Sequence, residues 1–408
     1  MIKKNFIPII LFLVMFAYAA TTSVQRIVLI GDSTVATYAV SKYPMAGWGQ
    51  VLGQFFKAGT VQITNLAAGG KSTRTYISEG HWAKALATLQ KGDVLMIQFG
   101  HNDRNTSDTS IFTDTAAYRK NLIQFATEAR ARGAHPIFIT PMNMNQWDKG
   151  QLRRYFTMGA YDYRGVMIRV AAEMKAPVLD LEEKSAKMMD TLGYEYLSKF
   201  HFLGLDSGEY PNFPKGSTDG THFQEMGALE NARMISEELA RLRNDSIASI
   251  LAPSLAPLYK VTVASLPDSV SLTTKSRYYP KGANITLKIR LAPQRAFLRW
   301  TDASNNWKVI DTLKRITFVQ DSFARTIVAV SANRTASENQ PQENISGLRQ
   351  QGKVLINSTN EMIEIRDITG MKITASSQKE YATSQLPAGF YIATFPSKPQ
   401  LVTKFLVR

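Results

Sequence analysis

Four short motifs hold the side chains of this sequence that could do chemistry together. In chain order they supply a serine, a glycine, an asparagine, and an aspartate paired with a histidine: Gly31-Asp-Ser-Thr34, Asn65-Leu-Ala-Ala-Gly-Gly-Lys-Ser-Thr-Arg74, Gln98-Phe-Gly-His-Asn-Asp103 and Asp219-Gly-Thr-His222. A serine hydroxyl becomes a nucleophile when a histidine held by a carboxylate takes its proton. Backbone N–H and amide groups stabilise the oxyanion that forms after attack on a carbonyl. The motifs therefore contain each type of group that attack on an acyl carbon needs.

The first motif places Ser33 directly after the apolar run Ile27–Ile30. A glycine at position 31 permits a tight turn, which would leave the Ser33 hydroxyl exposed at the end of a buried strand. The alternative is an ordinary turn in which Asp32 or Ser33 caps a helix. The tetrapeptide alone does not decide between the two.

The second and third motifs supply candidate donors to an oxyanion. Gly70 can offer a backbone N–H that no side chain blocks, and the Asn102 amide can be a second donor. Gly70 fits better than Gly69 because it directly precedes the Lys-Ser-Thr-Arg run. The glycine-rich loop is not a phosphate loop, since the G-x-x-x-x-G-K-[ST] spacing is missing. Taken singly, each residue could equally be part of a plain loop.

The fourth motif places Asp219 and His222 three residues apart, directly before a helix-like stretch. At a helix start both side chains can lie on one side of the turn. Asp219 would then hold the imidazole Nδ1–H and leave Nε2 to face a serine. The alternative is an aspartate that caps the helix, with an incidental histidine.

The other histidines predict no metal or second catalytic base. His101 stands between Gly100 and Asn102 and is expected to project away from any site that Asn102 lines. His81, His135 and His201 have no metal-ligand spacing around them. There is no cysteine, no H-E-x-x-H motif and no Asp-rich calcium motif, so we expect neither a catalytic metal nor a cofactor.

The elements that must position these motifs alternate between strand and helix from residue 26 to about 245. Short apolar runs bounded by Gly, Asn, Asp or Pro indicate buried parallel strands at Ile27–Ile30, Val61–Leu66, Val94–Phe99, Pro136–Thr140 and Val178–Leu181. Helical spacing marks Thr115–Ala131, Met158–Met174 and Gln224–Leu242. This alternation predicts a three-layer α/β/α fold whose ligands bind at the carboxyl ends of the strands, where three of the motifs fall.

The ordered motifs resemble those of the SGNH (GDSL-type) hydrolases, and within them the rhamnogalacturonan acetylesterase group. The motifs that carry the likeness, over residues 26–245, are the four above together with Gly47-Trp-Gly49 and Phe223 after His222. The resemblance implies a flavodoxin-like α/β fold and removal of acetyl groups from pectic polysaccharide. It assigns catalysis to Ser33, Asp219 and His222, and the oxyanion hole to Ser33, Gly70 and Asn102.

Arg74, Arg104 and Trp147 lie in the strand-end loops and are candidate substrate contacts, although a solvated rim explains the two arginines equally well. A polar cleft favours a polysaccharide. The alternatives are a lipase or thioesterase with an apolar cleft, and a surface adhesin whose hydrolase domain is inert.

Length and charge predict further modules. The 408 residues divide into a segment at 1–19, the hydrolase domain at 24–250, a small β-repeat-like module at 258–333 and a β domain at 346–408, with Ala252–Pro257 as a linker. Residues 251–335 hold 13 basic and 4 acidic side chains, or +9 of the total +15, whereas residues 26–250 hold 25 and 23, or +2. The basicity does not belong to the enzyme, so nucleic acid is not an expected partner. The basic module would either adhere to acidic glycan or to the acidic bacterial surface, or serve as a spacer.

The chain ends carry targeting signals. Lys3, Lys4, an apolar run and Ala17-Tyr-Ala19 are typical of a signal peptide cleaved after Ala19, and the run is too short for a membrane span, which needs ~20 apolar residues. The tail contains Ile363–Gly370, Leu386-Pro-Ala-Gly-Phe-Tyr-Ile392 and Lys404–Arg408. In these segments it resembles a type IX secretion sorting domain, and this likeness implies the type IX secretion machinery as a partner. We therefore expect a secreted, cell-surface or periplasmic protein with no transmembrane span.

Overall fold

The structure is a computed structural model that divides into two compact units. The described residues are 24–266, 271–333, 348–351, 354–359, 361–367, 371–387 and 389–407. The first unit extends to Val263 and also contains Leu272–Arg290 and Lys314–Arg325; the second consists of Ala264–Ser271, Leu291–Leu313 and Thr326–Arg408. The predicted signal peptide at 1–19 lies outside the described residues.

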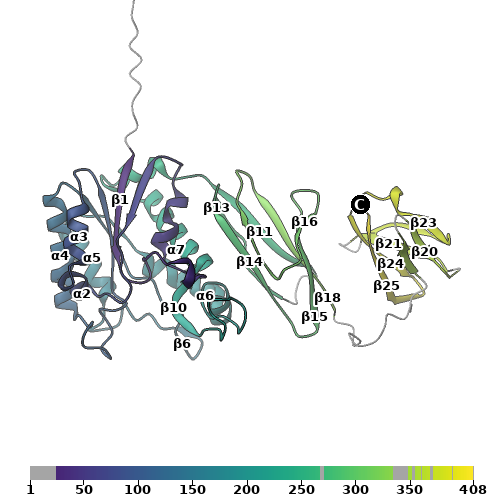
Figure 1. Ribbon diagram of the computed structural model, residues 1–408, viewed down its shortest axis with the longest axis horizontal. Coiled ribbons are helices and arrows are strands. Elements are labelled where there is room, and N and C mark those ends of the chain that lie inside the picture. The colour runs from purple at the N-terminus through teal and green to yellow at the C-terminus, as the bar shows by residue number, and fades with distance from the viewer. Residues whose placement is uncertain are drawn as a thin grey trace, which may run out of the picture. The chain divides into compact units, whose positions relative to one another are not determined.

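A five-stranded parallel sheet forms the centre of the first unit (Figure 1). Its strands in spatial order are β3 (Val61–Asn65), β1 (Gln25–Gly31), β4 (Val94–Gln98), β5 (His135–Ile139) and β8 (Val178–Leu179). This order, second-first-third-fourth-fifth along the chain, is the flavodoxin-like arrangement. Its direction of winding reverses between β1 and β4, and such a switch point opens a crevice at the carboxyl ends of the strands.

Helices cover both faces of this sheet. They are α1 (Trp48–Val51), α2 (Thr73–Ser78), α3 (His81–Thr88), α4 (Thr115–Ala131), α5 (Tyr163–Glu173), α6 (Leu181–Phe200), α7 (Glu225–Arg241) and α8 (Ala248–Leu251), with 3-10 turns η1 (Val40–Lys42), η2 (Leu52–Phe55) and η3 (Ala252–Ser254). In Figure 1, α2 to α5 lie on one side of β1, and α6 and α7 lie on the other. The three-layer α/β/α fold class is therefore confirmed.

The core between the sheet and α4 explains why that helix forms as predicted. Tyr118, Leu122 and Phe125 follow helical spacing and are fully buried against the β1 and β4 side chains Val28 and Ile97. Apolar residues three and four positions apart form one continuous stripe on a helix, which is what the sheet covers.

One helix start and one strand end differ from the prediction for local reasons. Helix α5 begins at Tyr163 rather than Met158, because the Asp162 side chain accepts a hydrogen bond from the Gly165 N–H and so caps the helix there. The apolar run expected to continue to Leu181 ends at Leu179, because Asp180 caps α6 in the same way.

A small antiparallel sheet holds the fourth motif. Strand β10 (Asp219–Gln224) lies between β2 (Met45–Ala46) and β9 (Phe202–Leu203). Helix α7 begins at Glu225, after the strand ends, so the motif precedes the helix as expected, and the alternative in which Asp219 caps that helix is wrong. A short hairpin, β6 (Trp147–Asp148) and β7 (Gln151–Leu152), lies elsewhere in this unit.

The segment expected to be a linker is fixed to the hydrolase fold. The Lys57 N–H donates to the Ser254 carbonyl at 2.8 Å, and the Ala256 N–H donates to the Phe55 carbonyl at 2.9 Å. Ala252–Ser254 form the turn η3. The segment 252–257 is thus hydrogen-bonded to residues 55 and 57 of the hydrolase.

The strands after residue 257 are divided between the two units. The first unit holds the pairing of β11 (Leu258–Leu266) with β13 (Arg277–Pro280), and the sheet of β12 (Ser271–Thr273), β14 (Asn284–Leu291) and β17 (Arg315–Val319). The second holds the pairing of β15 (Arg295–Asp302) with β16 (Lys308–Asp311) and β18 (Arg325–Asn333). The expected module 258–333 therefore does not coincide with one compact unit.

The C-terminal residues form two small antiparallel sheets, as the all-β prediction requires. Their strands are β19 (Leu348–Gln351), β20 (Val354–Asn357), β21 (Ile363–Asp367), β22 (Lys372–Ser376), β23 (Glu380–Ala382), β24 (Gly389–Phe395) and β25 (Lys398–Val407), with the turn η4 (Thr383–Gln385). Leu355, Ile363, Ile365 and Ala393 are fully buried in their shared core. Across the described part of the chain, no helix combines the length and apolar character of a membrane span.

Candidate active site

Ser33 lies two residues beyond the end of β1, with its hydroxyl facing His222. The Ser33 Oγ is 2.9 Å from the His222 Nε2, and the residue is 9% exposed. Gly31 makes the tight approach possible, since a Cβ there would come within 2.6 Å of the Gln98 carbonyl oxygen of β4. A larger residue at position 31 would push β1 away from β4 and displace the turn that carries Ser33.

The Asp219 carboxylate orients His222 through strand β10. Its Oδ2 lies 2.6 Å from the His222 Nδ1, while its Oδ1 accepts the N–H groups of Thr221 at 2.7 Å and His222 at 3.0 Å. Asp219 therefore caps its own turn rather than a helix. With Nδ1–H donating to the carboxylate, Nε2 is the free acceptor for the Ser33 proton.

The charges of the pair shift both pKa values. Burial alone would lower the pKa of His222, but the hydrogen bond and negative charge of Asp219 outweigh it and raise that pKa above its usual value. Burial alone would raise the pKa of Asp219, but the hydrogen bond and charge of His222 lower it. The pair thus favours the ionised aspartate and stabilises the imidazolium that proton transfer from Ser33 would create.

The two candidate oxyanion loops lie against the nucleophile turn and against each other. The Ala68 N–H donates to the Gly31 carbonyl at 2.9 Å. A Cβ atom added at Gly69 would lie 3.8 Å from the Ser33 Cβ. Gly70 has a left-handed φ of 73° with open space around it. The Asn102 amide donates one hydrogen to the Lys71 carbonyl at 3.0 Å, which leaves its second N–H for an oxyanion.

A buried chain of polar groups supports the Ser33 turn, and sequence reasoning missed it. The Asp32 Oδ1 accepts the N–H and hydroxyl of Thr34 at 2.9 and 2.7 Å, and its Oδ2 lies 3.1 Å from the His101 Nδ1. The Thr34 hydroxyl also accepts from Gln98, whose side-chain oxygen accepts from the Trp48 indole. The signal was present in the motifs, because Asp32 and His101 each flank a predicted site residue.

His101 points away from the triad, toward Asp32 and the segment after β5. Its Nε2 lies 3.1 Å from the Met142 carbonyl, so both ring nitrogens face acceptors. The ring therefore bridges the Asp32 carboxylate and the Met142 carbonyl. Burial alone would raise the pKa of Asp32, but the charge of His101 and the hydrogen bonds from His101 and Thr34 lower it.

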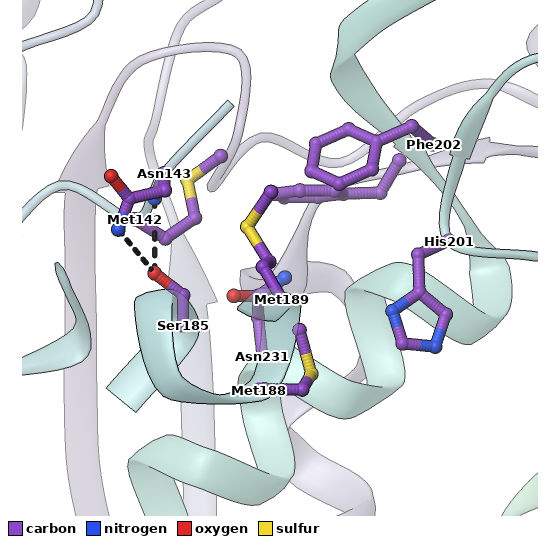
Figure 2. A pocket seen from close by; sticks show the side chains of 9 residues that line it. Met142, Asn143, Ser185, Met188, Met189, His201, Phe202 and Asn231 are labelled. Atoms are coloured by element: carbon purple, nitrogen blue, oxygen red, sulfur yellow. Dashed lines mark hydrogen bonds between the residues drawn. The ribbon is translucent and has the colours of Figure 1, made fainter. Parts of the chain in front are cut away.

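The segment after β5 is held on its other side by α6. Figure 2 shows the Asn143 amide turned toward Ser185, whose hydroxyl accepts from the Asn143 N–H at 3.0 Å and from Nδ2 at 3.1 Å. Two residues on, the Asn145 N–H donates to the Gly220 carbonyl at 2.7 Å. The segment therefore connects the His101 network to the turn between Asp219 and His222.

Two more side chains border the nucleophile region. The Tyr38 hydroxyl donates to the Ser33 carbonyl at 2.9 Å, and burial together with the charges of Asp32 and Asp219 raises its pKa to about 12. Asp103 is fully buried beside Asn102 and accepts both the N–H and the hydroxyl of Thr73. Burial raises the pKa of Asp103 to about 7, despite these hydrogen bonds.

The three predicted substrate contacts have partners of their own. The exposed Arg74 donates to the carbonyls of Thr109 and Ser110 at 2.8 and 2.7 Å. The half-buried Arg104 stacks over the Tyr155 ring, with its guanidinium carbon 4.6 Å from the ring centroid. The Trp147 indole donates to the Asn145 side chain at 2.7 Å, in the segment that reaches Gly220. Of the three, Trp147 is tied closest in the hydrogen-bond network to the Asp219 turn.

The cavity of Figure 2 is separate from these groups. It is lined by Met142, Asn143, Ser185, Met188, Met189, His201, Phe202, Phe223 and Asn231, and contains neither the triad nor the oxyanion candidates. His201 is buried there, and burial lowers its pKa to about 4. Within the described residues, no group of three His, Asp or Glu side chains could hold a metal ion.

Comparison with known proteins identifies the family. The profile of the GDSL-like Lipase/Acylhydrolase family matches residues 29–224. Over 217 residues the chain is 38% identical to the rhamnogalacturonan acetylesterase RhgT of Bacillus subtilis (strain 168), covering 53% of this chain and 90% of that relative. This protein belongs to the GDSL-like lipase/acylhydrolase family. It is a carboxylic ester hydrolase of the SGNH type.

The chain is also similar to the following proteins. The probable rhamnogalacturonan acetylesterase YesY of the same strain is 33% identical over 219 residues, which cover 53% of this chain and 94% of YesY. Among solved structures, the Bacillus subtilis protein YxiM is similar with a TM-score of 0.44 and 26% identity, over 53% of this chain and 56% of that one. An acetylxylan esterase from Geobacillus stearothermophilus gives a TM-score of 0.39 and 16% identity, over 52% and 93%.

Proposed function

We propose that this SGNH hydrolase is a carbohydrate acetylesterase that removes acetyl groups from plant cell-wall pectin, most specifically from rhamnogalacturonan. The observation that carries the chemistry is the continuous hydrogen-bonded path from Ser33 Oγ through His222 to Asp219, at 2.9 and 2.6 Å. The substrate class rests on the 38% and 33% identity to relatives named for rhamnogalacturonan deacetylation.

In the proposed mechanism Ser33 attacks the acetyl carbonyl while His222 Nε2 takes the hydroxyl proton. The oxyanion accepts hydrogen bonds from the N–H groups of Ser33 and Gly70 and from the Asn102 amide. Collapse of the tetrahedral intermediate breaks the ester bond, and His222 gives its proton to the departing sugar hydroxyl. A water then attacks the acetyl-serine with His222 again as base, which releases acetate and restores Ser33.

The test is acetate release from a panel of acetylated pectins, rhamnogalacturonan, acetylated xylan, and long-chain acyl and thioester substrates. The proposal expects the highest kcat/KM on acetylated rhamnogalacturonan. It expects no acetate release by the Ser33→Ala variant. A preference for long-chain esters or thioesters would favour a lipase or thioesterase instead. Binding of polysaccharide without any hydrolysis would favour an adhesin with an inert hydrolase domain.

We also propose that the protein is exported, since its polysaccharide substrate lies outside the cell. The support is the charged and apolar pattern of residues 1–19, together with the likeness of residues 346–408 to a type IX sorting domain. Mass spectrometry of the protein recovered from culture medium and membrane fractions tests this. The proposal expects a new N-terminus at Ala20, whereas an intact Met1 terminus on cytoplasmic protein would contradict it.

A further inference from the structure

Three strands beyond residue 270 pack on the hydrolase within the first compact unit, and they meet it with complementary charge. Basic side chains of β13 and β14 face acidic side chains of the hydrolase in four ion pairs: Arg277 with Glu230 at 3.3 Å, Lys288 with Glu209 at 2.6 Å, and Arg290 with Asp206 at 3.8 Å and with Glu195 at 3.9 Å. Strand β17 adds Arg315, which stacks 4.0 Å from the Tyr210 ring centroid. Part of the positive charge of residues 251–335 is therefore directed at the hydrolase.

Lys288 is the most deeply buried cation of this contact, with only 10% of its side chain exposed. Its ammonium donates to the Glu209 carboxylate, to the Gln224 side-chain oxygen and, at 3.4 Å, to the Lys199 carbonyl. An ammonium has three N–H donors, and three acceptors surround this one. A buried charge is costly unless it is paired in this way, so the three partners are held in a fixed arrangement.

Gln224 connects Lys288 to the candidate active site. It ends β10, two residues after His222, and is 1% exposed. Its side-chain N–H groups donate to the carbonyls of Phe202 and Lys199, so its oxygen must find a donor elsewhere. Besides Lys288, the Tyr210 hydroxyl faces this oxygen at 3.5 Å, the outer limit of a hydrogen bond.

Helix α7, which follows β10, is held by the same strands. The buried Glu230 of α7 accepts from the Tyr279 hydroxyl at 3.1 Å and from Arg277, both on β13. The Thr286 N–H of β14 faces the Met226 sulfur at 3.2 Å. The junction between β10 and α7 is thus fixed at residues 224, 226 and 230 by strands that the hydrolase motifs do not include.

We propose that Lys288 is a positioning residue for catalysis, which acts through Gln224 to hold the end of β10 and so the His222 imidazole at hydrogen-bonding distance from Ser33. The strands β13, β14 and β17 are then a working part of the hydrolase and not a spacer. This inference rests on the proposed role of His222. Because displacement of a catalytic group by ~1 Å can cost ~10²-fold in rate, a loosened β10 should lower kcat far more than substrate affinity.

The experiment compares Lys288→Met with the matched control Lys281→Met in the full chain, using 4-nitrophenyl acetate as the substrate. Lys281 is exposed, lies just before β14, and makes none of these contacts. Active sites are counted with a serine-directed phosphonate, so that kcat refers to folded sites. We expect Lys288→Met to lower kcat about tenfold or more with KM within about twofold, and Lys281→Met to leave both unchanged.

A double-mutant cycle tests the route through Gln224. If Lys288 acts through Gln224, the single variant Gln224→Met should lower kcat. Adding Lys288→Met to Gln224→Met should then lower kcat much less than Lys288→Met does in the wild type. Fully additive effects would overturn the route. An unchanged kcat in folded Lys288→Met would overturn the positioning role of Lys288. The proposed function would still stand in that case if Ser33→Ala is inactive.

A second variant covers the case in which Lys288→Met yields no titratable sites. Glu209→Gln removes the negative charge beside the ammonium and leaves Gln224 bound to it, and Glu209 is only partly buried. The proposal expects a smaller fall in kcat per titrated site, with KM retained. An unchanged kcat in this variant would count against the proposal. Activity in Ser33→Ala protein would instead overturn the proposed function itself.

Discussion

The Asp219 Oδ2 lies 2.6 Å from the His222 Nδ1, and this contact decides which ring nitrogen carries the proton. Because a carboxylate only accepts, Nδ1 must donate, and Nε2 is left to accept from Ser33 at 2.9 Å. The two residues lie in one strand, β10, so they move as a unit. The geometry makes Ser33 the group whose loss should matter most.

Replacing Ser33 with alanine should abolish turnover and leave the fold intact. The hydroxyl supplies the covalent step, and loss of a triad member costs on the order of 10⁴-fold or more in kcat. The measurement is hydrolysis of a chromogenic acetyl ester, with circular dichroism and thermal unfolding as the check on folding. A near-normal rate in pure Ser33→Ala protein would exclude Ser33 as the nucleophile.

Replacing Asn102 with alanine should lower kcat about 10²–10³-fold with little change in KM, as expected for one oxyanion donor. The variant also loses the hydrogen bond to the Lys71 carbonyl, which joins the two oxyanion loops. Arg74→Ala is a suitable comparison, because Arg74 holds nearby loop carbonyls without an oxyanion role. An effect of Asn102→Ala confined to KM would mean that Asn102 binds substrate in the ground state.

Asp219→Asn should lower activity less than His222→Ala and should move the acidic limb of the pH–rate profile to lower pH. His222 works as a base only when it is neutral, so activity rises with pH through its pKa. Asp219 raises that pKa, and its removal should let the pKa fall. Equal losses in the two variants would make Asp219 essential to the mechanism, and an unshifted limb would exclude it as the source of the raised pKa.

The parallel sheet and the order of the motifs could be predicted because their signals are local. Each central strand is a short apolar run, and helix α4 buries residues at regular helical spacing, so its bounds match the prediction. Strand β10 could not be predicted in the same way. Its partners β2 and β9 are two residues long, and such short strands leave no periodic pattern.

The contacts that support the site could not be predicted from the sequence, for a different reason. His101 and Asp32 are 69 residues apart, and Lys288 and Gln224 are 64 apart. Such pairings depend on how the elements pack, which no local pattern records. The same holds for residues 252–257, whose proline and alanine content suggests a linker although the backbone hydrogen-bonds to residues 55 and 57.

The buried pair of Asp32 and His101 should contribute strongly to stability. Replacing His101 with leucine leaves a buried carboxylate without its counter-charge, and breaking such a pair costs about 3–5 kcal/mol. Because the folded-state pKa of Asp32 is lowered, its contribution is present above the unfolded pKa of 3.8 and is lost as pH falls through the folded value. The destabilisation should therefore shrink in strong acid.

Urea unfolding of His101→Leu against the matched His135→Gln variant measures this effect. His135 is only partly buried at the start of β5, so we expect little change there. If His101→Leu unfolds at the same urea concentration as the wild type at neutral pH, the pair carries no net stability.

The basic residues of 251–335 differ in their contacts. Arg277, Lys288 and Arg290 are engaged with acidic side chains of the hydrolase. A truncated protein that ends near Leu251 would therefore lose the support of β10 together with the positive charge of residues 251–335. Exposed lysines allow a cleaner test; they are Lys260, Lys281, Lys308 and Lys314.

Changing these four lysines to glutamine should weaken retention on polygalacturonate at low salt and leave hydrolysis of a small acetyl ester unchanged. Galacturonate chains are polyanions, and exposed cations attract them through an interaction that salt screens over ~10 Å at 0.1 M. Retention on neutral xylan is the control and should not change. The attraction of the wild type should fade at high salt, whereas contacts with uncharged sugar would persist. If the wild type and the four-lysine variant are retained equally on polygalacturonate at low salt, these charges do not recruit substrate. The basic residues would then act only through the contacts of Arg277, Lys288 and Arg290 with the hydrolase.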